Sequence, residues 1–210
     1  MSEQNAFNPV RSAFFVANSL RGRIALWAGG VICSRGLSAI GEPVVYVYPS
    51  SEIRLGQSVT LISVSFGTAL GVNHPVVLRT LAPGAKIIIG DRVGISGGSI
   101  CAARLVEIGD DTMLGANVTI ADTDFHSLHP AHRRGHLHPT VGVAEVRIGK
   151  RVLVGTNAIV LKGVSIGDNS IIGAGSVVTK SVPENCIAAG NPCRVIRVLT
   201  PEELEGSKLG

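Results

Sequence analysis

An aliphatic residue that recurs every six positions is the feature of this chain that most restricts its fold. An α-helix repeats its faces every 3.6 residues and a β-strand every two, so a period of six fits neither element alone. It fits one flat side of a triangular coil, where a short strand precedes a turn of small residues and three such hexads close the coil. The recurrence has no slip at Ile148, Val154, Val160, Ile166, Ile172 and Val178.

Composition agrees with a solenoid of thin, stacked layers. Hydrophobic residues make up 45% of the 210 residues, but aromatic residues make up only 4%, and there are 26 glycines. A narrow interior filled by Val, Ile, Leu and Ala has no space for large rings, and repeated tight turns use glycine. We therefore predict an all-β fold, a parallel β-helix of hexapeptide repeats.

The same frame continues upstream with interruptions. It is kept by Ile53, Val59 and Val77 and then by Ile89, Ile95, Cys101, Ile108, Leu114 and Ile120. Between residues 120 and 148 the period is lost, so we expect an excursion loop over residues 121–147. The β-helix is expected over residues 53–199, with roughly five or six coils.

Each flanking segment is expected to contain a helix, and residues 1–52 are expected to form a cap that is partly helical and partly irregular. In residues 1–52, the apolar residues Leu20, Ile24, Trp27 and Val31 recur at helical spacing. We favour a helix that packs as a cap over one end of the β-helix, and a helix lying on a membrane surface is the alternative. In residues 200–210, the segment Thr200-Pro201-Glu202-Glu203 predicts a short helix that begins with a capping box.

Charge and cysteine content leave several function classes open. The net charge of +4 fits either an ordinary basic surface or an anionic ligand. Basic residues are scattered without an aromatic platform, so nucleic-acid binding is not expected. The four cysteines have no CxxC spacing, and the uncharged run over residues 24–34 is too short to span a bilayer. We expect a cytoplasmic protein whose membrane contact is at most peripheral.

The excursion loop contains five of the six histidines. Histidine can act as a general base near neutral pH, because its ordinary pKa is about 6.5. A nearby carboxylate would orient the ring and stabilise the imidazolium, and Asp122 and Asp124 are the local candidates. The other four histidines of this loop could be zinc ligands, but we favour the interpretation that they are solvated. They are His129, His132, His136 and His138.

The segment Asn117-Val118-Thr119-Ile120, followed by Asp122-Thr123-Asp124-Phe125-His126, resembles the catalytic segment of a known family. This family is the hexapeptide-repeat acyltransferases, in the branch of galactoside, maltose and polysaccharide O-acetyltransferases. The resemblance implies coils that wind left-handed, a homotrimer, His126 as the catalytic residue and Arg133 as an acceptor-side residue. The Ile-Ser-Gly-Gly form around Ser96 resembles acetyltransferases of surface-polysaccharide gene clusters, which places Ser96 on the acceptor side.

The segment from Gly173 to Pro183 and the turn Ala189-Gly190-Asn191-Pro192 resemble the C-terminal coil of the same acetyltransferases. The resemblance implies an acetyl-CoA site in a groove between neighbouring subunits. Small residues such as Gly155 would let the ligand approach the backbone, and cationic side chains would meet its phosphates. The other residues assigned to CoA by this resemblance are Thr156, Ala174, Thr179, Lys180, Arg194 and Arg197.

The predicted function is the transfer of an acetyl group from acetyl-CoA to the hydroxyl of a sugar or a surface-polysaccharide precursor. In this prediction His126 removes the hydroxyl proton in a ternary complex, with no metal ion. A serine or xenobiotic acetyltransferase is the alternative within the same chemistry. Two alternatives of another class are a zinc-dependent β-helix like a carbonic anhydrase and a non-catalytic assembly spacer.

Overall fold

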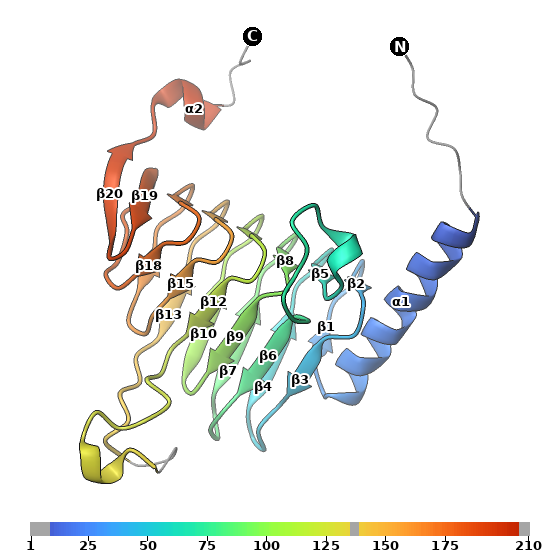
Figure 1. The fold of residues 1–210 in the computed structure, drawn as a ribbon, viewed down its shortest axis with the longest axis horizontal. Coiled ribbons are helices and arrows are strands. Elements are labelled where there is room, and N and C mark those ends of the chain that lie inside the picture. Colours follow the sequence, from blue (N-terminus) through green and yellow to red (C-terminus); the bar gives the residue numbers. More distant parts are fainter. Residues whose placement is uncertain (1–8, 135–138, 206–210) are drawn as a thin grey trace.

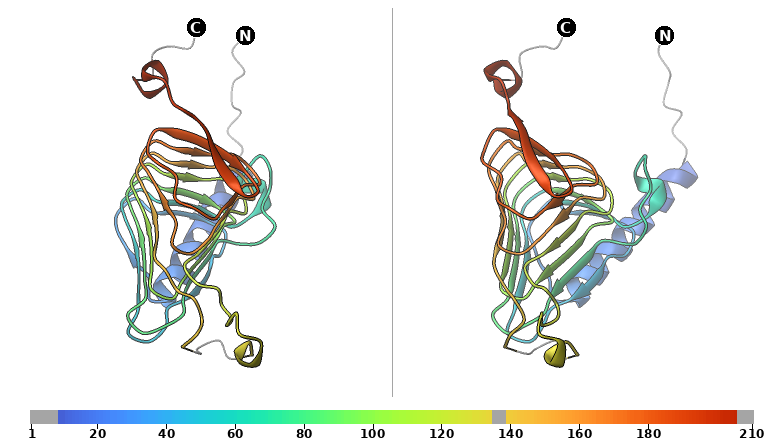
Figure 2. Two further views of the ribbon diagram at one scale, coloured as in Figure 1. Left: turned by 90° about the vertical axis from the view of Figure 1, so that its left-hand side faces the viewer. Right: turned by 60° about the vertical axis from the view of Figure 1, so that its left-hand side comes forward.

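The computed structural model describes residues 9–134 and 139–205, and it shows a parallel β-helix built from three sheets (Figure 1). Each coil adds one strand to each sheet, so the three-sided β-helix, which we call the prism, is seen nearly end-on when the molecule is turned (Figure 2). Within the described residues, six coils contribute to all three sheets. The predicted fold class is therefore confirmed, and we name the corners after the sheets that they join: A–B, B–C and C–A.

The three sheets have the following strands. Sheet A contains β1 (Ile32–Cys33), β4 (Glu52–Leu55), β7 (Lys86–Ile89), β10 (Leu105–Ile108), β13 (Val146–Ile148) and β16 (Ser165–Ile166). Sheet B contains β2 (Ser38–Ile40), β5 (Thr60–Ile62), β8 (Gly94–Ser96), β11 (Met113–Leu114), β14 (Leu153–Val154), β17 (Ile171–Ile172), β19 (Cys186–Gly190) and β20 (Cys193–Val198). Sheet C contains β3 (Val44–Tyr46), β6 (Val77–Thr80), β9 (Ser99–Ala102), β12 (Thr119–Ala121), β15 (Ile159–Val160) and β18 (Val177–Val178).

The aliphatic residue that begins each regular hexad points into the interior of the prism. Ile148, Val154 and Val160 are at most 2% exposed. Each one pairs in register with the residue three hexads later, for example Val154 with Ile172. In each B–C corner one residue has a left-handed backbone conformation. In the last three coils this residue is Asn117 (φ 62°), Asn157 (φ 58°) and Gly175 (φ 69°). Asparagine and glycine tolerate this conformation, so the turn chemistry of the hexads follows from their sequence.

Upstream, two interior positions differ from the expected frame. Ile100 and Leu78 are fully buried and pair in register, whereas Cys101 and Val77 lie beside them on half-exposed positions. At Cys101 the reason is a shorter corner after Ile95, where only four residues separate the interior positions Ile95 and Ile100. At Val77 the strand follows the 63–76 excursion, which does not keep the six-residue spacing. A one-residue shift of a strand exchanges its inward and outward faces. The expectations that Cys101 and Val77 hold the interior frame were therefore wrong.

The N-terminal boundary also differs from the expected one. The first coil begins at Ile32, because β1, β2 and β3 pair in parallel with β4, β5 and β6 of the second coil. Helix α1 (Pro9–Ala28) precedes this coil and packs on β2, so a helix does cover one end of the prism (Figure 1). Its contact face is made by Gly22 and Leu26, which are buried. Of the apolar set expected from the sequence only Val31, just after the helix, is buried, whereas the others are exposed: Leu20, Ile24 and Trp27.

Two excursions leave the coils. One spans residues 63–76 at a B–C corner and contains the 3-10 turn η1 (Ser65–Gly67). The other leaves β12 at the C–A corner of the fourth coil, contains the 3-10 turn η2 (Pro130–His132) and returns to β13. The second excursion is the loop that the lost period predicted.

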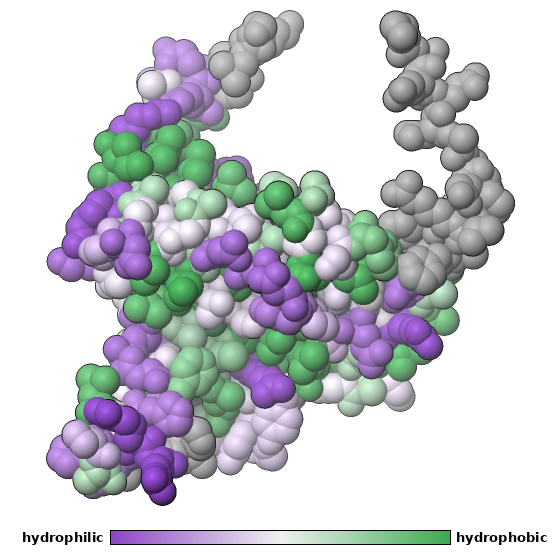
Figure 3. Space-filling view, viewed as in Figure 1, coloured by the Kyte–Doolittle hydropathy of each residue, from purple (hydrophilic) through white to green (hydrophobic). Residues whose placement is uncertain are grey.

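At the C-terminal end, β20 folds back antiparallel on β19, and α2 (Pro201–Glu205) follows. The capping box is confirmed: Thr200 Oγ1 accepts from the Glu203 amide, and Glu203 Oε2 accepts from the Thr200 amide at 2.8 Å. Apolar side chains of β20 are exposed at this end, where Figure 3 shows a green cluster: Val195, Ile196 and Val198. None of the helices in the described ranges has the length and hydropathy needed to cross a bilayer.

Candidate active site

The base of the 121–147 loop is a short antiparallel pairing. The Asp124 amide donates to the Gly142 carbonyl at 2.9 Å, and the Ala144 amide donates to the Asp122 carbonyl at 2.9 Å. Thr123 forms a bridge with Val143 between these two bonds. Both arms of the loop are thus fixed to each other where they leave the prism, before the chain reaches His126.

A tight turn presents His126. The His126 amide donates to the carbonyl of Asp124 at 2.6 Å, and Phe125 between them has a φ of 60°. A bulky residue in the left-handed region is uncommon and costs on the order of 1–2 kcal/mol, so it persists only where its neighbours impose it. The paired loop base supplies that restraint, and strain of this kind concentrates at functional sites.

The ring of His126 is oriented by a backbone carbonyl. Its Nδ1 lies 2.8 Å from the carbonyl oxygen of Arg133, on the other side of the loop. A carbonyl oxygen can only accept, so Nδ1 carries the proton in this hydrogen bond and the lone pair of the neutral ring is on Nε2. This tautomer is the one that a general base needs, and the residue is exposed to an incoming substrate.

Asp122 was expected to orient the ring of His126, but its carboxylate binds backbone amides. Its carboxylate is buried and accepts three backbone N–H groups of the preceding corner, from Ala103, Arg104 and Leu105, at 2.6–2.7 Å. These bonds tie the start of the loop to the coil below. Asp122 therefore lies next to the candidate base in sequence, but its oxygens are used by the fold.

Asp124 is bound by a residue that the sequence did not indicate. Its Oδ1 lies 3.1 Å from Nζ of Lys162, and both side chains are about one-third exposed or less. Lys162 is at the C–A corner of the next coil, directly beneath the loop. It is the third residue of the hexad 160–165, and the six-residue frame places this corner one coil after the loop. Only the six-residue frame could have indicated that Lys162 lies beside the loop, because the sequence of its own hexad has no unusual feature.

Thr179 and Lys180 lie on the same edge of the prism as His126. They follow β18, and the Leu161 amide bonds the Val178 carbonyl at 3.1 Å, so the corners of the fifth and sixth coils stack there. Both residues are exposed. The C–A edge thus presents the loop, then Lys162, which is already paired with Asp124, and then the exposed Lys180, whose charge would suit an anionic ligand.

Gly155, Thr156 and Ala174 lie on the B–C edge, at the opposite ends of the sheet C strands. A Cβ on Gly155 would lie 2.5 Å from the Ala174 amide nitrogen, so glycine is needed there for the coils to stack. The amide of Gly155 already donates to Ile172. Close stacking explains this glycine, whereas exposed Ala174 and half-buried Thr156 leave a corner of small side chains that a ligand can approach.

The two arginines expected near CoA differ in their contacts. Both are exposed on β20. Arg197 forms a bidentate ion pair with Glu203, with both N–O distances at 2.7 Å. These hydrogen bonds hold the pKa of Glu203 at about 2. Arg194 donates to the carbonyl of its neighbour Cys193. Of the two, Arg197 is the one already paired with a carboxylate.

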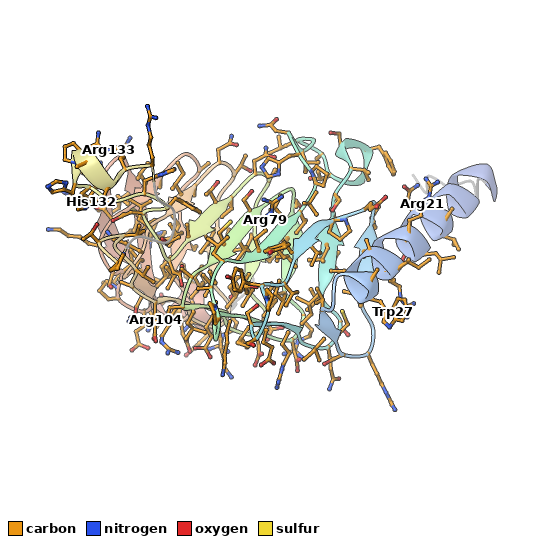
Figure 4. The ribbon with its side chains drawn as sticks, turned by 90° about the horizontal axis from the view of Figure 1, so that it is seen from below. Arg21, Trp27, Arg79, Arg104, His132 and Arg133 are labelled. Atoms are coloured by element: carbon orange, nitrogen blue, oxygen red, sulfur yellow. The ribbon has the colours of Figure 1, made fainter. Side chains whose placement is uncertain are left out.

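Arg133 and Ser96 occupy separate places. Arg133 is exposed on the loop, and its Nη2 donates to the Leu128 carbonyl at 3.1 Å; Figure 4 shows its side chain together with His132 at this end of the molecule. Ser96 ends β8 at the B–C edge, where its carbonyl accepts from Asn117 at 2.9 Å. Within one chain, Ser96 and His126 are thus on opposite edges of sheet C.

The cysteine thiols are possible nucleophiles, and the histidines are possible metal ligands. Burial raises the pKa of the Cys101 thiol, and the nearby Arg79 guanidinium opposes only part of this shift. Among residues 9–134 and 139–205, no three ligand-type side chains lie together as a metal site. The rings of His129 and His132 stack at 4.7 Å, while His136 and His138 lie outside the described residues.

A hollow of about 590 Å³ lies on the outer face of sheet A. Its lining includes Glu107 and Arg147, which form an ion pair with each other. None of the residues expected at the site lines it. The residues of the C–A edge form a more specific arrangement than this open hollow.

Comparison with known proteins identifies the repeat. The model of the family described as "Hexapeptide repeat of succinyl-transferase" matches residues 105–121 and 145–180. The coils that contain these residues match that hexapeptide repeat. The matched segments are the fourth coil and those after it, on both sides of the loop that holds His126.

Curated relatives are acetyltransferases. The galactoside O-acetyltransferase of Escherichia coli is 42% identical over 98 residues, which are 47% of this chain and 46% of that protein. A putative acetyltransferase of Saccharomyces cerevisiae is 38% identical over 122 residues, which are 57% of this chain and 60% of that protein. The chain thus spans about half the length of the curated relatives it matches. These similarities confirm the resemblance to the hexapeptide-repeat O-acetyltransferases.

Solved structures share the fold over most of the chain. A galactoside acetyltransferase in complex with coenzyme A aligns with a TM-score of 0.55 at 21% identity, over 96% of this chain and 88% of that one. The Bacillus cereus N-acyltransferase AntD, in complex with dTDP and 3-hydroxybutyryl-CoA, aligns with a TM-score of 0.67 at 18% identity, over 90% and 94% of the two chains. The likeness shows the left-handed parallel β-helix, whose hand the period of six leaves undetermined.

Proposed function

We propose that this chain is a CoA-dependent O-acetyltransferase that acetylates a hydroxyl group of a sugar or a surface-polysaccharide precursor. The observation on which the proposal depends is the presentation of His126, whose Nδ1 is bound to the Arg133 carbonyl. A spacer protein needs no strained turn that holds a histidine in the tautomer of a general base. The similarity to galactoside O-acetyltransferases supports the choice of reaction.

In the proposed mechanism both substrates are bound together. Nε2 of His126 takes the proton of the acceptor hydroxyl while its oxygen attacks the carbonyl carbon of the acetyl thioester. The tetrahedral intermediate then collapses, the C–S bond breaks, and the proton passes from the imidazolium to the CoA thiolate. The thiols give no support for a covalent route, because burial raises the pKa of the Cys101, Cys193 and Cys33 thiols and the thiolate is the nucleophilic form.

Acetyl-CoA is assigned to sheet C of the last two coils. Thr179 and Lys180 stand at one edge of this sheet and Thr156 and Ala174 at the other, with Arg194 near the end of the prism. The lysine and the arginine would bind phosphate groups as cations, and the small corner residues would allow the pantetheine arm close to the backbone. We assign no such role to Gly155 beyond coil stacking.

A homotrimer would bring the two edges together. Since His126 and Ser96 lie on opposite edges of sheet C, an acceptor that touches both needs a second copy of the chain. Closed rings of identical subunits form when such an edge-to-edge contact repeats around a threefold axis. The location that fits this reaction is the cytoplasm, where acetyl-CoA and activated sugars are available.

The test is release of free thiol from acetyl-CoA by the purified protein. The acceptor panel should contain simple sugars, a nucleotide sugar, a surface oligosaccharide, serine and chloramphenicol. We expect turnover with a glycan acceptor and a loss of about 10²–10⁴-fold in kcat for His126→Ala. The matched control is His129→Ala in the same loop, which should keep the rate.

Two outcomes would overturn the proposal. One is the absence of turnover with every acceptor. The other is an unchanged rate in His126→Ala, which would remove the only base in the mechanism. Turnover with serine or chloramphenicol alone would keep the chemistry and replace the acceptor class, and stoichiometric zinc in the purified protein would favour the metal-dependent alternative.

A further inference from the structure

Helix α1 has an apolar stripe that faces away from the protein. Its members are spaced by four, four and three residues, so they lie on one side of the helix. Their exposed fractions are 69% for Val16, 59% for Leu20, 53% for Ile24 and 80% for Trp27. Single exposed apolar residues are ordinary, but an unbroken stripe of four along one helix marks a surface that binds something apolar.

The stripe cannot be turned inward, because the opposite side of α1 fits the first coil closely. Gly22 is buried there, and a Cβ on it would lie 2.5 Å from the Ala39 carbonyl oxygen. Leu26 is 0% exposed, and the Val31 side chain just after the helix is also buried. The small residues are therefore used for packing, and the large apolar residues stay outside.

Basic residues flank the stripe on both sides. At about 100° per residue, Arg23 lies at one edge of the exposed face and Arg21 at the other. Both side chains are exposed, and Figure 4 shows Arg21 and Trp27 on opposite sides of α1. The sequence of α1 contains three arginines and no aspartate or glutamate. The exposed face thus combines an apolar centre with an arginine at each margin and no acidic residue.

We propose that α1 is an interfacial anchor that lies on a membrane surface rich in anionic lipid. A helix with an apolar face and arginine margins inserts that face among the headgroups and acyl chains while its cations meet lipid phosphates. Tryptophan favours this boundary, because its ring is apolar and its N–H is polar. A second copy of the helix is a poor occupant, since two such faces would bring arginines together with no acidic residue to neutralise them.

The position of the helix is compatible with the proposed enzyme activity but does not depend on it. α1 lies across the N-terminal end of the prism, whereas the loop that holds His126 leaves the fourth coil (Figure 1). The prism would stand on the membrane with its substrate-binding edges in the aqueous phase. Membrane binding and catalysis can therefore be measured separately.

The test uses the full chain and vesicles of phosphatidylcholine, with and without about 30% phosphatidylglycerol. Trp27 is the only tryptophan, so its fluorescence reports directly on the helix. We expect a blue shift and co-sedimentation with the anionic vesicles, both reduced at high salt. Leu20→Ser with Trp27→Ser should lower the partition coefficient more than tenfold in co-sedimentation, and Arg21→Gln or Arg23→Gln about fivefold each.

The matched control is Leu70→Ser, which replaces a leucine on the 63–76 excursion that is 75% exposed, against 59% for Leu20. It should bind vesicles as the unmodified chain does, and circular dichroism should show that all variants are folded. The proposal is wrong if the unmodified chain neither sediments with the anionic vesicles nor shifts its fluorescence. It is also wrong if the double variant changes the mass of the particle in solution, because the stripe would then be buried between protein copies.

Discussion

At the scale of single residues, the candidate base is held by the backbone and its neighbouring carboxylates are occupied elsewhere. His126 bonds the Arg133 carbonyl, Asp122 bonds three amides, and Asp124 pairs with Lys162. A carbonyl fixes the tautomer of the ring as well as a carboxylate does, but it stabilises an imidazolium less because it carries no net charge. The orientation of the base therefore depends on the shape of the loop.

The first prediction concerns Asp122. Replacing it by asparagine leaves at least one buried amide facing an NH₂ group, which should lower the free energy of unfolding by about 2–3 kcal/mol. Asp124→Asn, at a partly exposed ion pair, should cost no more than about 1 kcal/mol. Chemical denaturation of both variants measures the difference. Equal losses would show that the buried bonds of Asp122 are not what holds the loop.

The second prediction concerns Lys162, which we treat as a positioning residue. Lys162→Met keeps the side-chain length but releases Asp124, so the turn around Phe125 loses one restraint. We expect kcat to fall about three- to tenfold while the unfolding free energy changes by less than about 1 kcal/mol. Lys150→Met is the control, because Lys150 pairs with Asp110 at an A–B corner remote from the loop. Identical kinetics in the two variants would contradict the assignment.

A third prediction follows from the ion pair of the C-terminal tail. Hydrogen bonds from Arg197 hold the pKa of Glu203 at about 2, below its ordinary value of 4.5. A lowered folded-state pKa stabilises the folded chain above the ordinary value, and this contribution is lost as the pH falls through about 2. NMR titration of the Glu203 carboxyl should show the low pKa, and Arg197→Gln should return it towards 4.5. A normal pKa in the unmodified chain would mean that Arg197 is available to ligands.

At the scale of the elements, the corners rather than the strands limit what the repeat tolerates. Strands of two residues, such as β14 and β17, pair only briefly, and backbone hydrogen bonds between stacked corners, such as that from Gly155 to Ile172, continue the contact between neighbouring coils. A glycine is required where one corner passes within van der Waals contact of the next. Glycines inside the strands are under no such restriction.

The fourth prediction compares two glycines. Gly155→Ala places a methyl group against the backbone of Ala174, so the coils must separate locally, at a cost of about 1–3 kcal/mol. Gly94→Ala is the control, since its added Cβ meets no atom within 4 Å and its backbone is not left-handed. It should be neutral or slightly stabilising. Thermal unfolding of both variants decides whether stacking explains the glycine of the corner.

At the scale of the whole molecule, the prism separates the candidate residues into two edges. The C–A edge has the loop, Lys162 and Lys180, and the B–C edge has Ser96, Thr156 and Ala174. A chain that acts alone could use only one edge at a time. The proposed trimer resolves this, because each site would combine the C–A edge of one copy with the B–C edge of the next.

The fifth prediction tests this arrangement. In solution the particle should have three times the 21.8 kDa mass of the chain. His126→Ala and Ala174→Arg should each be inactive, but co-refolded mixtures should regain activity at about a quarter of the interfaces, where both intact edges meet. Light scattering and the thiol assay make the two measurements. A monomer, or mixtures that remain inactive, would show that each site lies within one chain.

The sequence alone determined the β-helix, its regular interior from Ile148 to Val178 and the position of the loop. It could do so because a coil needs only its two neighbours, so the period of six is a local and repeated property of the chain. It also indicated His126 and the capping box at Thr200, which are local patterns as well. The role of His126 as the base stays a prediction until the thiol assay is done.

Only the tertiary structure decided the partners of individual side chains. The frame shift at Cys101, the first coil that starts at Ile32 and the ion pair of Asp124 with Lys162 each depend on contacts between residues far apart in the sequence. The same is true of α1, where the small face packs and the large apolar face stays exposed, because the space beside Ala39 admits no Cβ. Periodicity gives the direction of a side chain relative to its own element, and only packing decides what that side chain meets.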